Sequence, residues 1–132
     1  MKQGIKNLLE PKLLFGVAFV YTLLITIALL LPITGVPKIE SIPFLDKIIH
    51  FIINALLFLV WASYAFSRKL KSVKPFNLQL LFICILIYGI LIELIQESLI
   101  PTRSADVFDV LANFCGLILG SLVVKVSNKF IY

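Results

Sequence analysis

The sequence predicts an all-α fold: a multipass membrane bundle of four antiparallel transmembrane helices, forming a single domain over residues 1–132. Hydrophobic residues make up 61% of the chain and charged residues 14%, and the mean hydropathy is +1.07, far above that of soluble domains. The hydrophobic residues gather in long runs separated by short polar segments. Strand-like alternation is absent, and in lipid only helices or closed barrels satisfy the backbone. Any site must therefore be built from helices and their ends.

The first run, Leu13 to Leu31, carries no charge and is long enough to cross roughly 30 Å of hydrocarbon at about 1.5 Å per residue. Lysines precede it, as in a signal peptide, but the run exceeds the usual apolar core of about 7 to 15 residues and no small-residue cleavage pattern follows. We therefore expect a retained first span. The other three predicted spans are Ile48 to Phe66, Leu78 to Ile100, and Val107 to Val124.

The basic residues predict the orientation of these spans. If the N-terminus lies inside, nine of the 12 basic residues fall on the cytoplasmic side, and only Lys38, Lys47 and Arg103 fall outside. This asymmetry predicts that both termini are cytoplasmic. The net charge of +5 is spread between the spans, with no basic stripe that interleaves aromatic residues, so we expect the lipid bilayer as partner and no nucleic acid.

The two cysteines, Cys84 and Cys115, lie in separate spans and at different depths in this orientation. A disulfide between them is therefore not expected. We interpret both as buried thiols that fill gaps between helices.

Polar residues set into or beside the second, third and fourth spans are the main indication of function. An ionised side chain near the bilayer centre costs roughly 2.5 to 3.5 kcal/mol on insertion scales. In the predicted orientation these residues all lie in the outer part of the bilayer or just above it: Asp46, His50, Asn54, Glu93, Gln96, Arg103, Asp106, Asp109 and Asn113.

Helical spacing places these residues on common faces. Asp46, His50 and Asn54 recur every four residues, and steps of three and four also connect two further groups, Glu93 with Gln96 and Glu97, and Asp106 with Asp109, Asn113, Gly116 and Gly120. The glycine pair is a small-xxx-small pattern, which predicts that a neighbouring helix approaches the fourth span closely. We expect the polar stripes to face one another.

Structural explanations remain open for several of these residues. Asp46 can cap the second helix, and Asp106 and Asp109 are first-turn acids favoured by the helix dipole. The amides of Asn54, Gln96 and Asn113 can serve as interhelical hydrogen bonds. Glu93, about two turns inside an apolar run, and His50, the only histidine, one turn from Asp46, are harder to explain in this way.

The same residues carry a resemblance to the VanZ-like family. Asp46-Lys47-Ile48-Ile49-His50-Phe51 resembles the D-K-x-x-H-F entry to a helix in that family, and Glu93-Leu94-Ile95-Gln96 resembles its E-x-x-Q. The stretch from Arg103 to Asn113 resembles R-x-x-D-x-x-D-x-x-x-N, and glycines follow it. The resemblance implies a small bacterial multipass protein of the cell envelope, in a family whose founding member is associated with resistance to the glycopeptide antibiotic teicoplanin. It implies no settled molecular activity.

Three functions remain open at this stage. The first is an outward-facing, acidic, histidine-containing pocket that binds or processes an envelope lipid or glycan. The second is an enzyme that transfers or hydrolyses a lipid-linked phosphate or glycan group, with catalytic candidates Asp46, His50, Glu93 and Asp109. The third is a non-catalytic structural or proton-coupled protein. The remaining polar residues are binding candidates: Asn54, Gln96, Arg103, Asp106 and Asn113.

In the enzymatic hypothesis Arg103 holds a phosphate, and a divalent cation is held by Asp106, Asp109 and Glu93. No motif requires that cation. The oligomeric state and the identity of the substrate or ligand are left open by the sequence.

Overall fold

The computed structural model describes residues 10–31, 44–69, 77–99 and 106–131. These residues form four α-helices, α2 (Pro11–Leu30), α3 (Leu45–Lys69), α4 (Leu78–Leu99) and α5 (Val107–Ile131), and no strand occurs among them. All four helices are long and apolar enough to cross a membrane. The predicted all-α, multipass fold class is therefore confirmed.

The helices differ from the predicted spans mainly at their polar ends. α3 begins at Leu45 rather than Ile48 and ends at Lys69 rather than Phe66, and α5 continues past Val124 to Ile131. A hydrophobic run marks only the part of a helix that suits lipid, whereas backbone hydrogen bonding continues through polar residues such as Asp46 and Lys47. α2 and α4 match their predicted spans within two residues.

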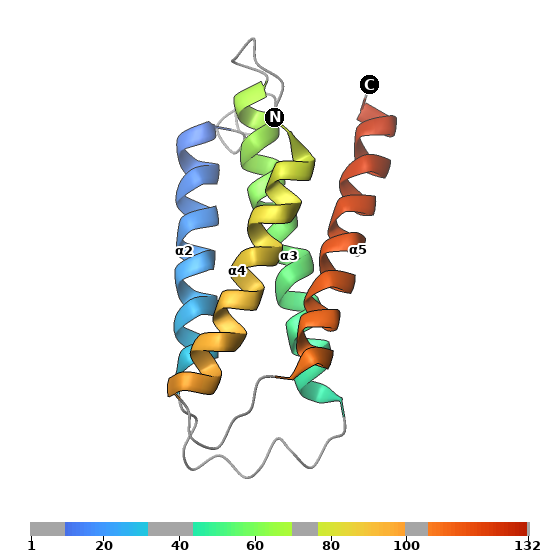
Figure 1. Ribbon diagram of the computed structural model, residues 1–132. Coiled ribbons are helices and arrows are strands. Elements are labelled where there is room, and N and C mark those ends of the chain that lie inside the picture. Colours follow the sequence, from blue (N-terminus) through green and yellow to red (C-terminus); the bar gives the residue numbers. More distant parts are fainter. Residues whose placement is uncertain (1–9, 32–43, 70–76, 100–105, 132) are drawn as a thin grey trace.

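Consecutive helices run in opposite directions (Figure 1). Ring contacts pair the start of α2 with the end of α3, through Phe15 and Tyr64. α3 and α4 are likewise antiparallel, because Phe58 contacts Phe82 while His50, nearer the start of α3, lies beside Glu93, nearer the end of α4. The start of α3 therefore lies beside the end of α4, and it also lies beside the start of α5, where Lys47 pairs with Asp109.

α3 is the central helix, and it packs against α2, α4 and α5. Its Leu57 and Phe58 are fully buried, together with Leu117 of α5, and Ile85 of α4 lies in the same apolar cluster. Because each helix presents its remaining large apolar side chains outward, the bundle has a lipid-compatible surface around a narrow core.

Close contact between α3 and α5 depends on two glycines. A Cβ atom at Gly116 would lie 2.2 Å from the carbonyl oxygen of Phe51, and one at Gly120 would lie 3.0 Å from that of Ala55. The predicted close approach at the small-xxx-small pair is confirmed, and the neighbouring helix is α3. This contact brings the polar faces of α3 and α5 together.

Both cysteines are free and exposed on the bundle surface. The prediction that they are buried thiols was wrong, because each lies on the outward face of its helix, among side chains such as Ile83 and Phe114 that are also exposed.

Candidate functional site

Buried polar side chains converge at the end of the bundle where α3 and α5 begin and α4 ends. Five side chains from three helices meet there, and each is at most 5% exposed: His50, Asn54, Glu93, Asp109 and Asn113. His50 and Asn54 lie on successive turns of α3, and Asp109 and Asn113 on successive turns of α5, so each pair faces the same way. We call these five residues, with Asp46, Lys47 and Asp106 at the end of the bundle, the polar cluster.

His50 lies at the centre of the polar cluster. Its Nδ1 atom is 3.2 Å from Asn113 Oδ1 and 3.4 Å from Glu93 Oε1, and its Nε2 atom is 3.7 Å from Asp46 Oδ1. Asn54 Nδ2 donates to Asn113 Oδ1 at 2.5 Å, which identifies that atom as the amide oxygen. Because Asn113 Oδ1 is an acceptor, Nδ1 carries a proton and donates it to that oxygen.

With a proton on Nδ1, the neutral and the charged forms of the His50 imidazole differ at Nε2. If the imidazole is neutral, Nε2 is a lone pair that faces the Asp46 carboxylate; if it is charged, Nε2 carries the second proton. Nε2 is buried and has no hydrogen-bond partner.

Space for the cluster comes from Gly89 on α4. A Cβ atom there would lie 3.1 Å from Asn113 Nδ2, so a larger residue would press on the amide that orients His50. Sequence reasoning missed this role, although Gly89 lies one helical turn before Glu93.

Lys47 connects Asp106, just before α5, to Asp109 in the first turn of α5. Its Nζ atom lies 2.7 Å from Asp106 Oδ2 and 3.2 Å from Asp109 Oδ1. The Lys47 ammonium, and then the backbone N–H of Phe108, hold the pKa of Asp106 below its ordinary value. The sequence placed Lys47 in the family motif but assigned it no role; its position one residue after Asp46 was the available signal.

The predicted helix-capping role holds for Asp106 but not for Asp46. Asp106 immediately precedes α5, and its Oδ1 accepts a hydrogen bond from the Phe108 N–H at 2.9 Å, so it caps that helix. Asp46 lies inside the first turn of α3 rather than before it. Its side chain is 43% exposed at the end of the bundle, and its Oδ1 atom lies 3.7 Å from His50 Nε2.

Gln96 and Glu97 lie apart from the polar cluster. The Gln96 side chain is buried, and its Nε2 donates to the Leu29 carbonyl at 2.7 Å, which satisfies an orphan carbonyl in the last turn of α2. Glu97 is exposed. Glu97 lies about 40° from Glu93 on the side away from Gln96, and about 100° from Gln96, so the three residues do not share one buried face as expected. Arg103 lies outside the described residues.

A second polar network, which the sequence analysis missed, holds α2 in place. Trp61 Nε1 donates to Thr22 Oγ1 at 3.0 Å, and Thr26 Oγ1 lies 2.7 Å from Tyr88 Oη. The hydroxyl of Tyr21 donates to the carbonyl of Ile53 at 3.2 Å. The spacing of Thr22 and Thr26, one helical turn apart in an otherwise apolar span, was the available signal.

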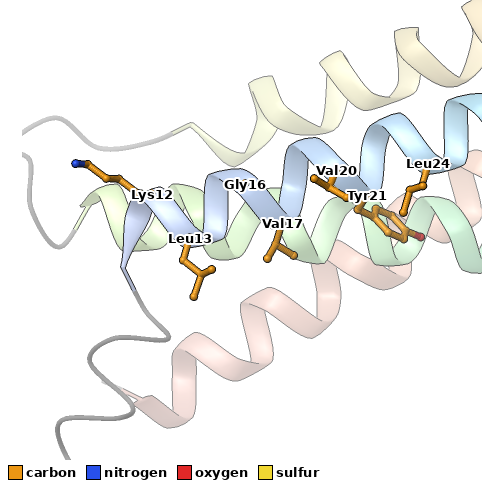
Figure 2. Close-up of a pocket in the computed structure, with 7 residues that line it drawn as sticks. All are labelled: Lys12, Leu13, Gly16, Val17, Val20, Tyr21 and Leu24. Carbon is orange, nitrogen blue, oxygen red and sulfur yellow. The ribbon is translucent and has the colours of Figure 1, made fainter.

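An open groove of about 480 Å³ runs along α2 toward its start (Figure 2). Apolar side chains such as Leu13, Val17 and Leu24 line it, and only Lys12 and Tyr21 add polar atoms. It is separate from the polar cluster, and its apolar character suits lipid acyl chains.

Among the described residues, one group of side chains is arranged to hold a metal ion: Asp46, His50 and Asp109, whose ligand atoms lie within 4.8 Å of one another. This differs from the predicted cation set of Asp106, Asp109 and Glu93. Asp106 instead pairs with Lys47, and Glu93 lies on the Nδ1 side of His50.

The fold and the cluster together define a multi-pass membrane protein with buried acidic and imidazole groups at one end of its bundle. The chain belongs to the VanZ/LLP1 family, whose profile matches residues 12–128. This match confirms the resemblance seen in the motifs and extends it to the first span. No curated protein and no solved structure matches the chain.

Proposed function

We propose that the polar cluster binds the polar headgroup of an envelope lipid or glycan at the outer surface of the membrane. The observation that carries the proposal is the burial of His50, Glu93 and Asp109 against one another at a bundle end, where Asp46 connects them to the surface. Groups this costly to bury in a membrane protein are typically found at functional sites.

Two atoms in the cluster support binding over a purely structural role. His50 Nε2 and Asn54 Oδ1 are buried without hydrogen-bond partners. A network that served only to hold helices together would be expected to satisfy such atoms, since each unsatisfied group costs about 1–3 kcal/mol. A ligand that reaches the cluster offers the missing partners.

The charges of the cluster favour a ligand rich in donors. Among the described residues of the cluster, the carboxylates of Asp46, Glu93, Asp106 and Asp109 outnumber the ammonium of Lys47. Sugar hydroxyls and headgroup amines donate to carboxylates, so they suit this environment better than a bare anion does. The neighbouring helices expose apolar side chains, including Ile48, Ile52 and Phe108, against which the acyl chains of a lipid can lie.

A lipid-retention measurement tests the proposal. We expect protein purified in mild detergent and offered phosphatidylethanolamine or a polyprenyl-phosphate-linked sugar to retain one of these probes at about one molecule per chain by native mass spectrometry. His50→Gln and Glu93→Gln should each lower retention by about tenfold or more, because each removes a group buried in the cluster.

Glu97→Gln is the matched control, because Glu97 lies on the same helix as Glu93 but is exposed. Its retention should equal that of the unmodified protein. Circular dichroism of all three variants should show the same helix content. Equal retention by every variant, or no retention of either probe by the unmodified protein, contradicts the proposal.

The orientation has its own test, since the site must face outward to meet envelope substrates. In a protein whose exposed native cysteines are replaced, Cys84→Ser and Cys115→Ser, we expect Ser104→Cys to react with a membrane-impermeant maleimide in intact cells. Lys71→Cys, in the segment predicted to be cytoplasmic, should react only after the cells are opened. The reverse pattern would place the cluster on the cytoplasmic side.

An enzymatic role is the second candidate, and the position of His50 favours it. The imidazole lies between two carboxylates, 3.4 Å from Glu93 and 3.7 Å from Asp46, which is an arrangement suited to a general acid or base. Release of free sugar or phosphate over time from the bound probe, lost in His50→Gln, would distinguish turnover from binding.

A further inference from the structure

His50 Nε2 is buried in the cluster and has no hydrogen-bond partner. On the other side of the ring, Nδ1 donates to Asn113 Oδ1, with Glu93 Oε1 at 3.4 Å, so in the neutral imidazole Nε2 presents a lone pair. Asp46 Oδ1, which is also an acceptor, lies 3.7 Å from Nε2. A buried lone pair therefore faces a carboxylate that reaches the surface, and a cation between the two acceptors removes their repulsion.

The ring is held as metal-binding histidines are held. A histidine that binds a metal through one nitrogen usually donates its other N–H to a carboxylate or carbonyl oxygen, which sets both the tautomer and the ring orientation. Glu93 and Asn113 occupy those positions around Nδ1. Asn54 in turn fixes the Asn113 amide through a hydrogen bond of 2.5 Å.

A third ligand comes from α5. The carboxylate of Asp109 offers an atom within 4.8 Å of the ligand atoms of Asp46 and His50. In a tetrahedral zinc site the ligand atoms lie roughly 3.4 Å apart, so ligand atoms up to 4.8 Å apart need to approach by up to about 1.4 Å. The side chain of Asp46 is 43% exposed, so it is less tightly packed than those of His50 and Asp109.

We propose that Asp46, His50 Nε2 and Asp109 together hold one divalent transition-metal ion, with Zn²⁺ as the favoured ion. The mixed nitrogen and oxygen ligands suit Zn²⁺, whereas Mg²⁺ and Ca²⁺ prefer oxygen alone. Three protein ligands leave a position open. The ion then joins the carboxylates to an oxygen of the headgroup, and in this respect the inference rests on the proposed function.

The Lys47 ammonium competes with a metal ion for the Asp109 carboxylate. Its ammonium already lies 3.2 Å from Asp109 Oδ1, so one oxygen of that carboxylate is engaged and the other is left for the metal. The two positive groups then repel each other across Asp109. Replacing the ammonium with the methyl sulfide of Lys47→Met should tighten metal binding.

Zinc binding to the chelator-stripped protein in detergent, without added lipid, tests the proposal. We expect one Zn²⁺ per chain in competition with a fluorescent zinc indicator, and a visible absorption band on substitution with Co²⁺. His50→Gln and Asp109→Asn should weaken binding by more than about 100-fold, beyond the roughly 10- to 100-fold cost of an outer-shell change such as Glu93→Gln. Glu97→Gln should bind as the unmodified protein does.

Asp46→Asn shows whether a loss of zinc binding can be separated from a loss of fold. Asp46 is the most exposed of the three ligands, so its replacement leaves the buried contacts of His50 and Asp109 in place. This variant should also lose binding and the Co²⁺ band. Zinc binding that is absent from the unmodified protein, or equal in Asp46→Asn, His50→Gln and Glu97→Gln, overturns the proposal. Because no lipid is present, a failure here leaves the lipid-retention result standing, and a failure of lipid retention leaves zinc binding standing.

Discussion

Gly116→Ala is expected to separate α3 from α5 and to lower the free energy of unfolding by about 3 kcal/mol, at the upper end of the usual cost of overpacking. The added methyl group would lie 2.2 Å from the Phe51 carbonyl oxygen. A backbone atom cannot rotate away as a side chain can, so the helices must move apart. The same movement would pull Asn113 away from His50, because both contacts lie on the same helix pair.

Two other glycines provide the comparison. Gly120→Ala should cost less, since its Cβ atom would lie 3.0 Å from Ala55 O and Phe58 Cβ. Gly16→Ala, on α2, meets nothing within 4 Å and should not lower stability. Thermal unfolding in detergent, followed by circular dichroism, gives the three values. An order other than Gly116 first, Gly120 second and Gly16 last would contradict the α3–α5 packing.

Lys47→Met should destabilise the bundle on the order of 2 kcal/mol, because it leaves the Asp109 carboxylate without its ammonium partner. The Asp109 side chain is only 7% exposed, whereas that of Lys47 is 28% exposed. Partial exposure of the lysine keeps the cost below the 3–5 kcal/mol, roughly, of breaking a fully buried pair. Unfolding at pH 7 in low salt measures the loss.

Neutralising the carboxylate provides the control. Asp109→Asn in the Lys47→Met background should restore most of the lost stability, since the double variant buries no uncompensated charge there. Asp106→Asn should have a smaller effect than Lys47→Met, because the Asp106 side chain is 36% exposed and water can replace its partner. If Asp109→Asn does not restore the stability lost in Lys47→Met, Lys47 does not stabilise the bundle by pairing with Asp109.

The sequence predicted much of the fold because membrane helices are specified by local properties. Run length and hydropathy identified α2, α3, α4 and α5, and the glycine pair predicted a close helix contact. Prediction failed where exposure depends on packing. Both cysteines and Glu97 lie on outward faces, because the rotation of each helix against its neighbours decides which side chains are exposed, and the surrounding apolar residues do not mark it.

For the candidate site too, the sequence indicated part of the arrangement and the tertiary structure decided the rest. By itself the sequence determined which polar residues are costly to place in lipid, and helical periodicity placed Asp46, His50 and Asn54 on one face. Only the tertiary structure decided their partners: it directs His50 Nδ1 to Glu93 and Asn113, connects Lys47 to Asp106 and Asp109, and assigns Gln96 to the end of α2. Such pairings depend on how helices are rotated and offset against one another, and those two quantities are set by contacts such as Gly116 against Phe51, which join residues far apart in the chain.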